Sequence, residues 1–182
     1  MNLQAFREES RDWLESNCPK SMRIGAVHFE DAYELYQTDE ALEWRDRADV
    51  KGWTAPAWPT QYGGGGLSRE QHQVLAEEMA RIKAIPPATG MGLAMIGPTI
   101  LEMGTEEQRQ RHTPRIVTGE AQWCQGYSEP GAGSDLAGLQ TKAVLDGDEF
   151  IINGQKIWTS GAQYANWMFA LVRTDPNAPK HE

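Results

Sequence analysis

Two short segments of this 182-residue chain carry residue types that could bind a planar cofactor. Residues 126–135 read Gly-Tyr-Ser-Glu-Pro-Gly-Ala-Gly-Ser-Asp, and Trp158-Thr159-Ser160 follow after two strand-like runs. A loop rich in Gly and Ser leaves backbone N–H groups free to bind anionic or carbonyl oxygens. A tryptophan downstream can lie flat on a heteroaromatic ring. Neither segment is specific alone; together they predict a pocket for a heteroaromatic cofactor.

Other chemistries fit these residues less well. A hydrolase nucleophile elbow needs Gly where Pro130 stands, so no serine nucleophile is predicted. Glu129 and Asp135 resemble an acid pair, but turn-rich chain between them does not fix their separation, and we interpret both as structural. The loop glycines could serve only a tight turn, and the tryptophan could be ordinary sheet packing. The cofactor interpretation is therefore favoured only for the combination.

Composition and charge disfavour several classes of protein. With 17 Lys and Arg against 26 Asp and Glu, the net charge of −9 argues against binding to nucleic acid or to anionic membranes. Cys18 and Cys124 are far apart and lack a C-x-x-C pattern, which predicts buried free thiols and no metal site. Residues 1–9 carry acids where a signal peptide needs a basic segment, so we expect a cytoplasmic protein.

The elements before the first segment are predicted to be helical. Apolar residues recur at helical spacing from Leu3 to Leu14, and Pro19 ends this first amphipathic helix. A second helix is predicted over residues 31–50. Residues 52–66 contain two prolines and four consecutive glycines, which indicates a loop.

Two more helices are predicted to begin at capping boxes. Ser68 with Gln71, and Thr105 with Gln108, have the spacing at which the cap hydroxyl and the third-residue side chain satisfy free N–H groups. Between them, residues 91–103 are apolar with a proline inside, which predicts a buried helix that is short or kinked.

From residue 121 onward the pattern favours strands. Asp146-Gly147 and Asn153-Gly154 predict hairpin turns. The predicted strands are residues 122–128, 141–145, 150–152, 156–159 and 167–173. We therefore expect an α+β protein: an N-terminal all-α helical domain, residues 1–120, followed by an antiparallel β-barrel or sandwich-like domain, residues 121–182, that is incomplete.

The sequence resembles the acyl-CoA dehydrogenases, flavoproteins that remove two hydrogens from the Cα–Cβ bond of a CoA thioester. Residues 126–135, 156–160, 52–59 and 62–64 carry the resemblance. A ten-residue match at the change from helices to strands is more specific than a lone Gly-rich loop.

The resemblance implies FAD as the cofactor and matches individual positions to it. Ser134 also matches a residue near the thioester, and Trp158 is the candidate for packing on the flavin ring. Tyr127 and Thr159 depart from the commonest family pattern, which has smaller or aliphatic residues there. The matched cofactor-binding positions are Gln125, Gly126, Tyr127, Ser128, Gly133, Ser134, Trp158, Thr159 and Ser160.

The resemblance also implies a mechanism and partners. A glutamate removes the α-proton of an acyl-CoA while the β-hydrogen leaves as hydride to the flavin, which gives the trans-2-enoyl-CoA and passes electrons to an electron-transfer flavoprotein or similar acceptor. The family places that glutamate on a C-terminal four-helix bundle. We expect residues 1–182 to be a truncated piece that lacks the catalytic base and is inactive alone. Full-length members are expected to form homo- or hetero-oligomers.

Three alternatives remain open. The same scaffold supports flavin-dependent oxidases and monooxygenases, which oxygen consumption would distinguish. The chain could instead be a non-catalytic subunit of a two-chain acyl-CoA dehydrogenase, or an interaction module that binds no flavin. The apolar positions that shape an acyl pocket have no readable code, so the acyl group is not predicted.

Overall fold

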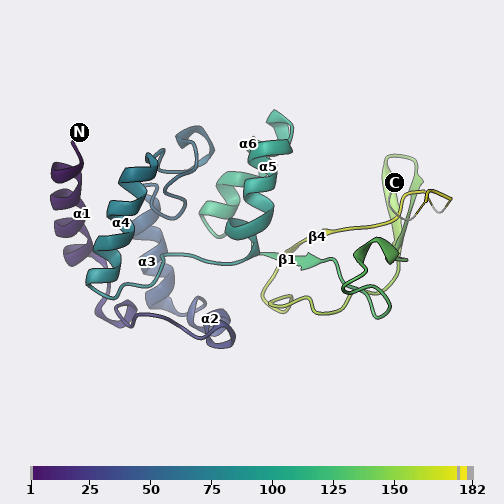
Figure 1. The fold of residues 1–182 in the computed structure, drawn as a ribbon, viewed down its shortest axis with the longest axis horizontal. Coiled ribbons are helices and arrows are strands. Elements are labelled where there is room, and N and C mark those ends of the chain that lie inside the picture. The colour runs from purple at the N-terminus through teal and green to yellow at the C-terminus, as the bar shows by residue number, and fades with distance from the viewer. Residues whose placement is uncertain (1, 176, 180–182) are drawn as a thin grey trace. The chain divides into compact units, whose positions relative to one another are not determined.

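Helices dominate the first part of the chain and short strands the second (Figure 1). The computed structural model describes residues 2–175 and 177–179. The chain divides into two units, residues 1–121 and 122–182. The α-helices are α1 (Leu3–Asn17), α2 (Phe29–Leu35), α3 (Asp39–Asp49), α4 (Arg69–Arg81), α5 (Gly97–Met103) and α6 (Glu106–Val117). The shorter helical turns are η1 (Lys20–Met22), η2 (Thr60–Tyr62), the π-helix η3 (Gly92–Ile96) and η4 (Leu136–Gly138).

Both predicted capping boxes are confirmed. The Ser68 hydroxyl accepts from the N–H of Gln71 at 3.2 Å, and the Gln71 side chain accepts from the N–H of Ser68 at 2.9 Å. Thr105 and Gln108 make the same pair of bonds at the start of α6. These bonds satisfy donors that a helix cannot pair internally, which is why α4 and α6 begin where they do.

Two helix predictions need correction. The helix predicted over residues 31–50 is divided into α2 and α3, because Thr38 adopts an extended backbone and caps α3 through the N–H of Ala41 at 3.4 Å. The apolar segment 91–103 is η3 followed directly by α5, with its proline in the first turn of α5, so the predicted interruption is a π-helical turn before the proline. It is not a buried helix, since Met103 is 78% exposed.

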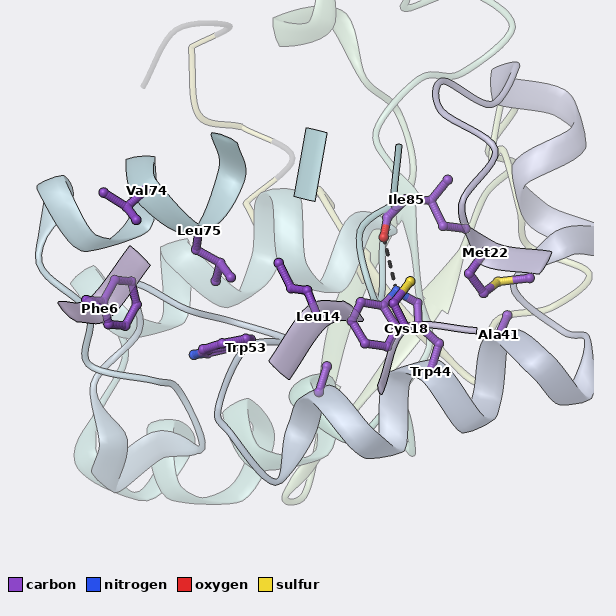
Figure 2. Packing of buried hydrophobic residues seen from close by; sticks show 11 residues of the cluster. Phe6, Leu14, Cys18, Met22, Ala41, Trp44, Trp53, Val74, Leu75 and Ile85 are labelled. Carbon is purple, nitrogen blue, oxygen red and sulfur yellow. Dashed lines mark hydrogen bonds between the residues drawn. The ribbon is translucent and has the colours of Figure 1, made fainter. Parts of the chain in front are cut away.

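The core of the first unit lies where α1 packs against α4, with α3 beside them (Figure 1). Figure 2 shows the Trp44 indole N–H donating to the carbonyl of Ile85, at 3.0 Å, inside this cluster. The ring of Trp13 lies edge-on to Trp53, with centroids 4.7 Å apart. The buried cluster consists of Phe6, Leu14, Cys18, Met22, Ala41, Trp44, Ala48, Trp53, Val74, Leu75 and Ile85.

A buried acid also joins α1 to α4. Glu78 is 2% exposed, and its carboxylate accepts from Arg7, Arg11 and Arg81 at 2.8–3.1 Å. The Arg11 guanidinium, together with Arg81 and Arg7, outweighs the effect of burial and lowers the pKa of Glu78 to about 2. The acid therefore stays ionised and paired, as a buried charge must be.

The described residues of the second unit form two sheets of two strands each. The strands are β1 (Trp123–Gly126), β2 (Lys142–Asp146), β3 (Glu149–Asn153) and β4 (Trp167–Ala170). β1 pairs with β4, and these two strands are parallel; β2 and β3 form an antiparallel hairpin. The predicted antiparallel barrel or sandwich is therefore not formed by the described residues. Just before the strand pair, the N–H of Gln122 donates to the Asn166 side chain at 2.9 Å across 44 positions of sequence.

Of the two predicted hairpin turns, one is confirmed. Gly147 has φ +64° and follows β2 directly, so Asp146-Gly147 begins the β2–β3 turn. Gly154 does not begin a second hairpin; a Cβ there would lie 2.3 Å from the Thr141 hydroxyl oxygen, so close approach to Thr141 requires this glycine. The predicted strand 156–159 is also absent, because Trp158 leaves the extended region with φ 59°.

Cys18 and Cys124 are buried free thiols, as predicted. Burial raises the pKa of each thiol. None of the helices within the described residues has the length and apolar character needed to cross a membrane.

Candidate functional site

The first candidate segment begins in β1. Gln125 and Gly126 pair in parallel register with Phe169 and Ala170 of β4. Beyond the strand, the Tyr127 ring lies edge-on to that of Phe169, with centroids 5.5 Å apart. The strand pair thus fixes where the chain enters the Gly-rich loop.

The loop itself is closed by a small bridge. Glu129 and Ala132 exchange two backbone hydrogen bonds, each 3.0 Å long, around the intervening Pro130-Gly131. Gly133 and Ser134 follow the bridge and are exposed. The loop therefore has a defined base and presents its second half to solvent.

The fold does not require glycine at two positions of this loop. Neither Gly131 nor Gly133 has a positive φ, and a Cβ built at either position meets no atom within 4 Å. A turn with left-handed backbone at these positions would have shown the opposite, so the turn that contains Gly131 does not itself require a glycine. Close approach of a ligand to bare backbone remains a physical reason for glycine at both positions, and the space that each Cβ would fill is compatible with a cofactor.

The second candidate segment follows β3 and is anchored to the first. The N–H of Ile157 donates to the carbonyl of Ser128 at 2.9 Å, and the N–H of Ser160 donates to the carbonyl of Trp158 at 3.0 Å. Trp158 is 84% exposed and has φ 59°. Sheet packing therefore does not explain this residue.

Left-handed backbone in a bulky residue costs about 1–3 kcal/mol and concentrates at ligand sites. Thr159 is half-buried and Ser160 exposed, so two hydroxyl residues directly follow the exposed tryptophan in the sequence. An exposed aromatic plane with donors beside it is suited to a flat ligand.

Glu129 of the first segment and Lys156 of the second form a buried ion pair. Nζ of Lys156 lies 2.8 Å from Oε1 of Glu129 and 3.1 Å from the carbonyl oxygen of Tyr127. The other acceptor sites of the carboxylate are used by the N–H groups of Gln140, at 2.6 Å, and Thr141, at 2.9 Å. Burial would raise the pKa of Glu129, but these hydrogen bonds prevail and lower it to about 2.

The structure thus brings Tyr127 and Ser128 next to the segment that leads into Trp158. None of the hydrogen bonds and ring contacts described above involves Gly133 or Ser134. The sequence analysis interpreted Glu129 as structural and gave Lys156 no separate role. A signal was present: the first matched segment carries two acids and the second one lysine, and a buried pair is what opposite charges in neighbouring loops can form.

No group of His, Cys, Asp and Glu suited to a metal ion occurs in the part of the chain that the structure describes. Residues 2–120 match the family of acyl-CoA dehydrogenase N-terminal domains, and residues 124–182 match the family of acyl-CoA dehydrogenase middle domains. The chain belongs to the acyl-CoA dehydrogenase family. Its helical first unit followed by a small β unit is the order of domains in that family.

Among curated proteins, acyl-CoA dehydrogenase IpdE1 of Mycobacterium tuberculosis is 40% identical over 99% of this chain and 47% of its own length. The chain thus spans about half the length of the curated relatives it matches over its whole extent.

Solved structures of family members are similar as well. A structure described as the Tcur3481-Tcur3483 steroid ACAD matches 98% of this chain at 38% identity, with a TM-score of 0.71, and this chain covers 45% of it. The ChsE4-ChsE5 complex of M. tuberculosis matches 98% at 35% identity, with a TM-score of 0.69 and 44% of that chain covered. An acyl-CoA dehydrogenase of Bacillus anthracis complexed with FAD shares the fold over 94% of this chain and 28% of its own, at 23% identity and a TM-score of 0.61.

Proposed function

We propose that this chain carries flavin-facing residues of an FAD-dependent acyl-CoA dehydrogenase, which oxidises the Cα–Cβ bond of an acyl-CoA thioester to the trans-2-enoyl-CoA. The observation that carries the proposal is Trp158, an exposed aromatic residue in left-handed backbone, bound through its neighbour Ile157 to Ser128. Family membership supports the reaction class.

The residues present are compatible with a flavin. Ser128, Thr159 and Ser160 would supply hydroxyl and backbone donors to the ring, and Trp158 would pack on its face. Bound FAD supplies a ring that accepts hydride. Donors fixed beforehand stabilise charge on such a ring at little reorganisation cost. The exposed Ser134 would donate toward the thioester from the same loop.

The two buried carboxylates are unsuited to the role of catalytic base. The pKa of Glu78 and that of Glu129 are each lowered to about 2, so neither accepts a proton readily near neutral pH. Both are instead proposed to hold structure together. We therefore assign the role of proton-abstracting base to no described residue of either unit.

The substrate and partners follow from the relatives. One structural relative, 38% identical, is described as a steroid ACAD, which supports an acyl-CoA with a steroid skeleton as the substrate class. Another is a complex of two named chains, ChsE4 and ChsE5, which supports assembly with an unlike chain of the same family. An electron-transfer flavoprotein or similar carrier is the proposed electron acceptor.

FAD retention tests the proposal. The purified chain is incubated with FAD, free cofactor is removed, and the visible absorption spectrum is recorded. We expect a retained flavin band that Trp158→Ala shifts and weakens, whereas Phe150→Ala, which removes another exposed aromatic ring of the same unit, leaves it unchanged. A chain that retains no flavin, or equal spectra for the two variants, would contradict the proposed site.

The oxidase alternative is tested on the same sample. After reduction of the retained flavin, we expect an artificial electron acceptor to reoxidise it faster than dissolved oxygen does. Faster consumption of oxygen would favour the oxidase or monooxygenase reading of the scaffold.

A further inference from the structure

Two consecutive residues of the second candidate segment form hydrogen bonds to three consecutive residues of the first. Lys156 binds the Tyr127 carbonyl and the Glu129 carboxylate, and the N–H of Ile157 donates to the Ser128 carbonyl. The two segments are therefore joined by both a side-chain ion pair and a backbone bond.

The ion pair is buried, and both oxygens of its carboxylate accept hydrogen bonds. The side chains of Lys156 and Glu129 are 10% and 6% exposed, and two backbone N–H groups, from Gln140 and Thr141, complete the carboxylate. Removing one partner of such a pair leaves the other charge buried and unpaired, which is strongly unfavourable. The pair therefore resists separation of the segments that carry it.

The backbone of Trp158 needs such support. A strained residue keeps its conformation only when its surroundings impose it. With 84% of Trp158 exposed, its own packing imposes little. Its own carbonyl accepts from the nearby N–H of Ser160, and the fixed points that tie it to the first segment are the bonds of Ile157 and Lys156, one and two positions before it.

We infer that Glu129 and Lys156 form a positioning clamp for the flavin site, which fixes residues 157–160 against residues 127–129. What the site binds rests on the proposed function, but the clamp is a property of the chain without cofactor. Lys156 and Glu129 are positioning residues, because they act through the backbone of their neighbours.

Amide hydrogen exchange of the cofactor-free 182-residue chain tests the clamp directly. We compare Lys156→Met with Lys156→Arg, which keeps a cation, and with Lys142→Met, which removes an exposed lysine from the same unit. Lys156→Met should accelerate exchange at Ile157 by about tenfold or more while the amides of the β2–β3 hairpin change by less than about twofold. Lys156→Arg should restore much of the protection, and Lys142→Met should change neither.

Two results would overturn the inference. Unchanged exchange at Ile157 in Lys156→Met would show that the pair does not hold the segment. Equal acceleration throughout the second unit would show a general stabilising role. If Lys156→Met does not fold, Glu129→Gln takes its place, since it removes the ion pair while its amide oxygen can still accept from one of the two backbone N–H groups. Selective acceleration at Ile157 then supports the clamp, and unchanged exchange refutes it.

FAD titration separates failure of the clamp from failure of the proposed function. We expect Lys156→Met to weaken FAD binding by about tenfold and Lys156→Arg to recover part of it, as supporting residues do at other sites. A wild-type chain that binds no FAD contradicts the proposed function, while hydrogen exchange still decides the clamp. FAD binding that is equal in wild type and Lys156→Met, despite faster exchange at Ile157, contradicts the role of the clamp in the flavin site.

Discussion

Two Gly-rich loops of this chain, residues 63–66 and 129–135, differ in what their glycines do. In the first, Gly63 and Gly66 have φ +89° and +60°, and a Cβ on Gly64 would lie 2.2 Å from the carbonyl oxygen of Trp58. In the second, Gly131 and Gly133 have neither a positive φ nor a neighbour that a Cβ would meet. Packing and backbone conformation therefore explain the first loop, and the second is left for a ligand to explain.

Apolar residues show the same contrast between the units. Leu14 of α1 is fully buried, whereas Leu145 of β2 is 62% exposed. The hairpin exposes over half of most of its large apolar side chains, while the first unit buries Phe6, Trp44 and Trp53 in one cluster. Stability of the described chain is thus concentrated in the first unit, and the second is organised around its loops.

The largest effect on the free energy of unfolding is expected from a matched pair of leucine substitutions. Leu14→Ala should lower the free energy of unfolding by about 3 kcal/mol, because it leaves a cavity in the core. Leu145→Ala should lower it by less than about 0.5 kcal/mol, because its side chain is already solvated. Urea denaturation of both variants measures the difference. Equal losses would remove the contrast between the units.

A second pair sharpens the comparison of loops. Gly64→Ala should destabilise the chain by about 2 kcal/mol, since the new methyl group would overlap the Trp58 backbone. Gly131→Ala should change stability by less than about 0.5 kcal/mol. Thermal unfolding checks both, and a large loss in Gly131→Ala would show that the fold does require that glycine.

Acid titration tests the buried acid of the first unit. Glu78→Gln should cost about 1.5 kcal/mol at neutral pH, because charged hydrogen bonds to three arginines are lost. The folded-state pKa of Glu78, about 2, is below its ordinary value of 4.5, so this stabilisation is complete above pH 4.5 and declines as pH falls toward 2. The difference between wild type and variant should shrink over that window. A difference that does not depend on pH would exclude ionisation as its source.

The smallest expected change in stability accompanies a change in binding. Gly133→Ala should leave the melting temperature nearly unchanged but weaken FAD binding by about tenfold, or about 1.4 kcal/mol, if a ligand approaches this backbone closely. Parallel FAD titration of Gly147→Ala provides a control, since that hairpin glycine has φ +64° and lies outside the site. We expect Gly147→Ala to lower the stability of the chain and to leave its FAD affinity unchanged.

Local signals in the sequence predicted much of the fold. The capping boxes at Ser68 and Thr105 involve residues three positions apart, and propensity and pattern report such short-range bonds. Thr38, followed by two acids, carried a readable cap signal that the long predicted helix overlooked. Long-range pairing was not readable: β1 pairs in parallel with β4, which lies 44 positions later in the sequence, as in the register of Trp123 with Trp167.

In the candidate site, too, the sequence carried local signals but not the long-range contacts. Residue types and spacing identified the two segments, and the exposure of Trp158 shows that it is not ordinary sheet packing. The backbone of Trp158 could not be predicted, because the β-like pattern of residues 156–159 carries no sign of a left-handed residue. Nor could the pairing of Glu129 with Lys156, which are 27 positions apart and meet only in the folded chain.

The most direct test of the account pairs two measurements on Trp158→Asn. Asparagine tolerates left-handed backbone better than tryptophan does, and little packing is lost at so exposed a position. If the strained tryptophan is there for the flavin, the melting temperature should stay the same or rise, while FAD affinity should fall by about tenfold or more. A lower melting temperature with unchanged FAD affinity would show that Trp158 serves the fold, and would contradict the proposed site.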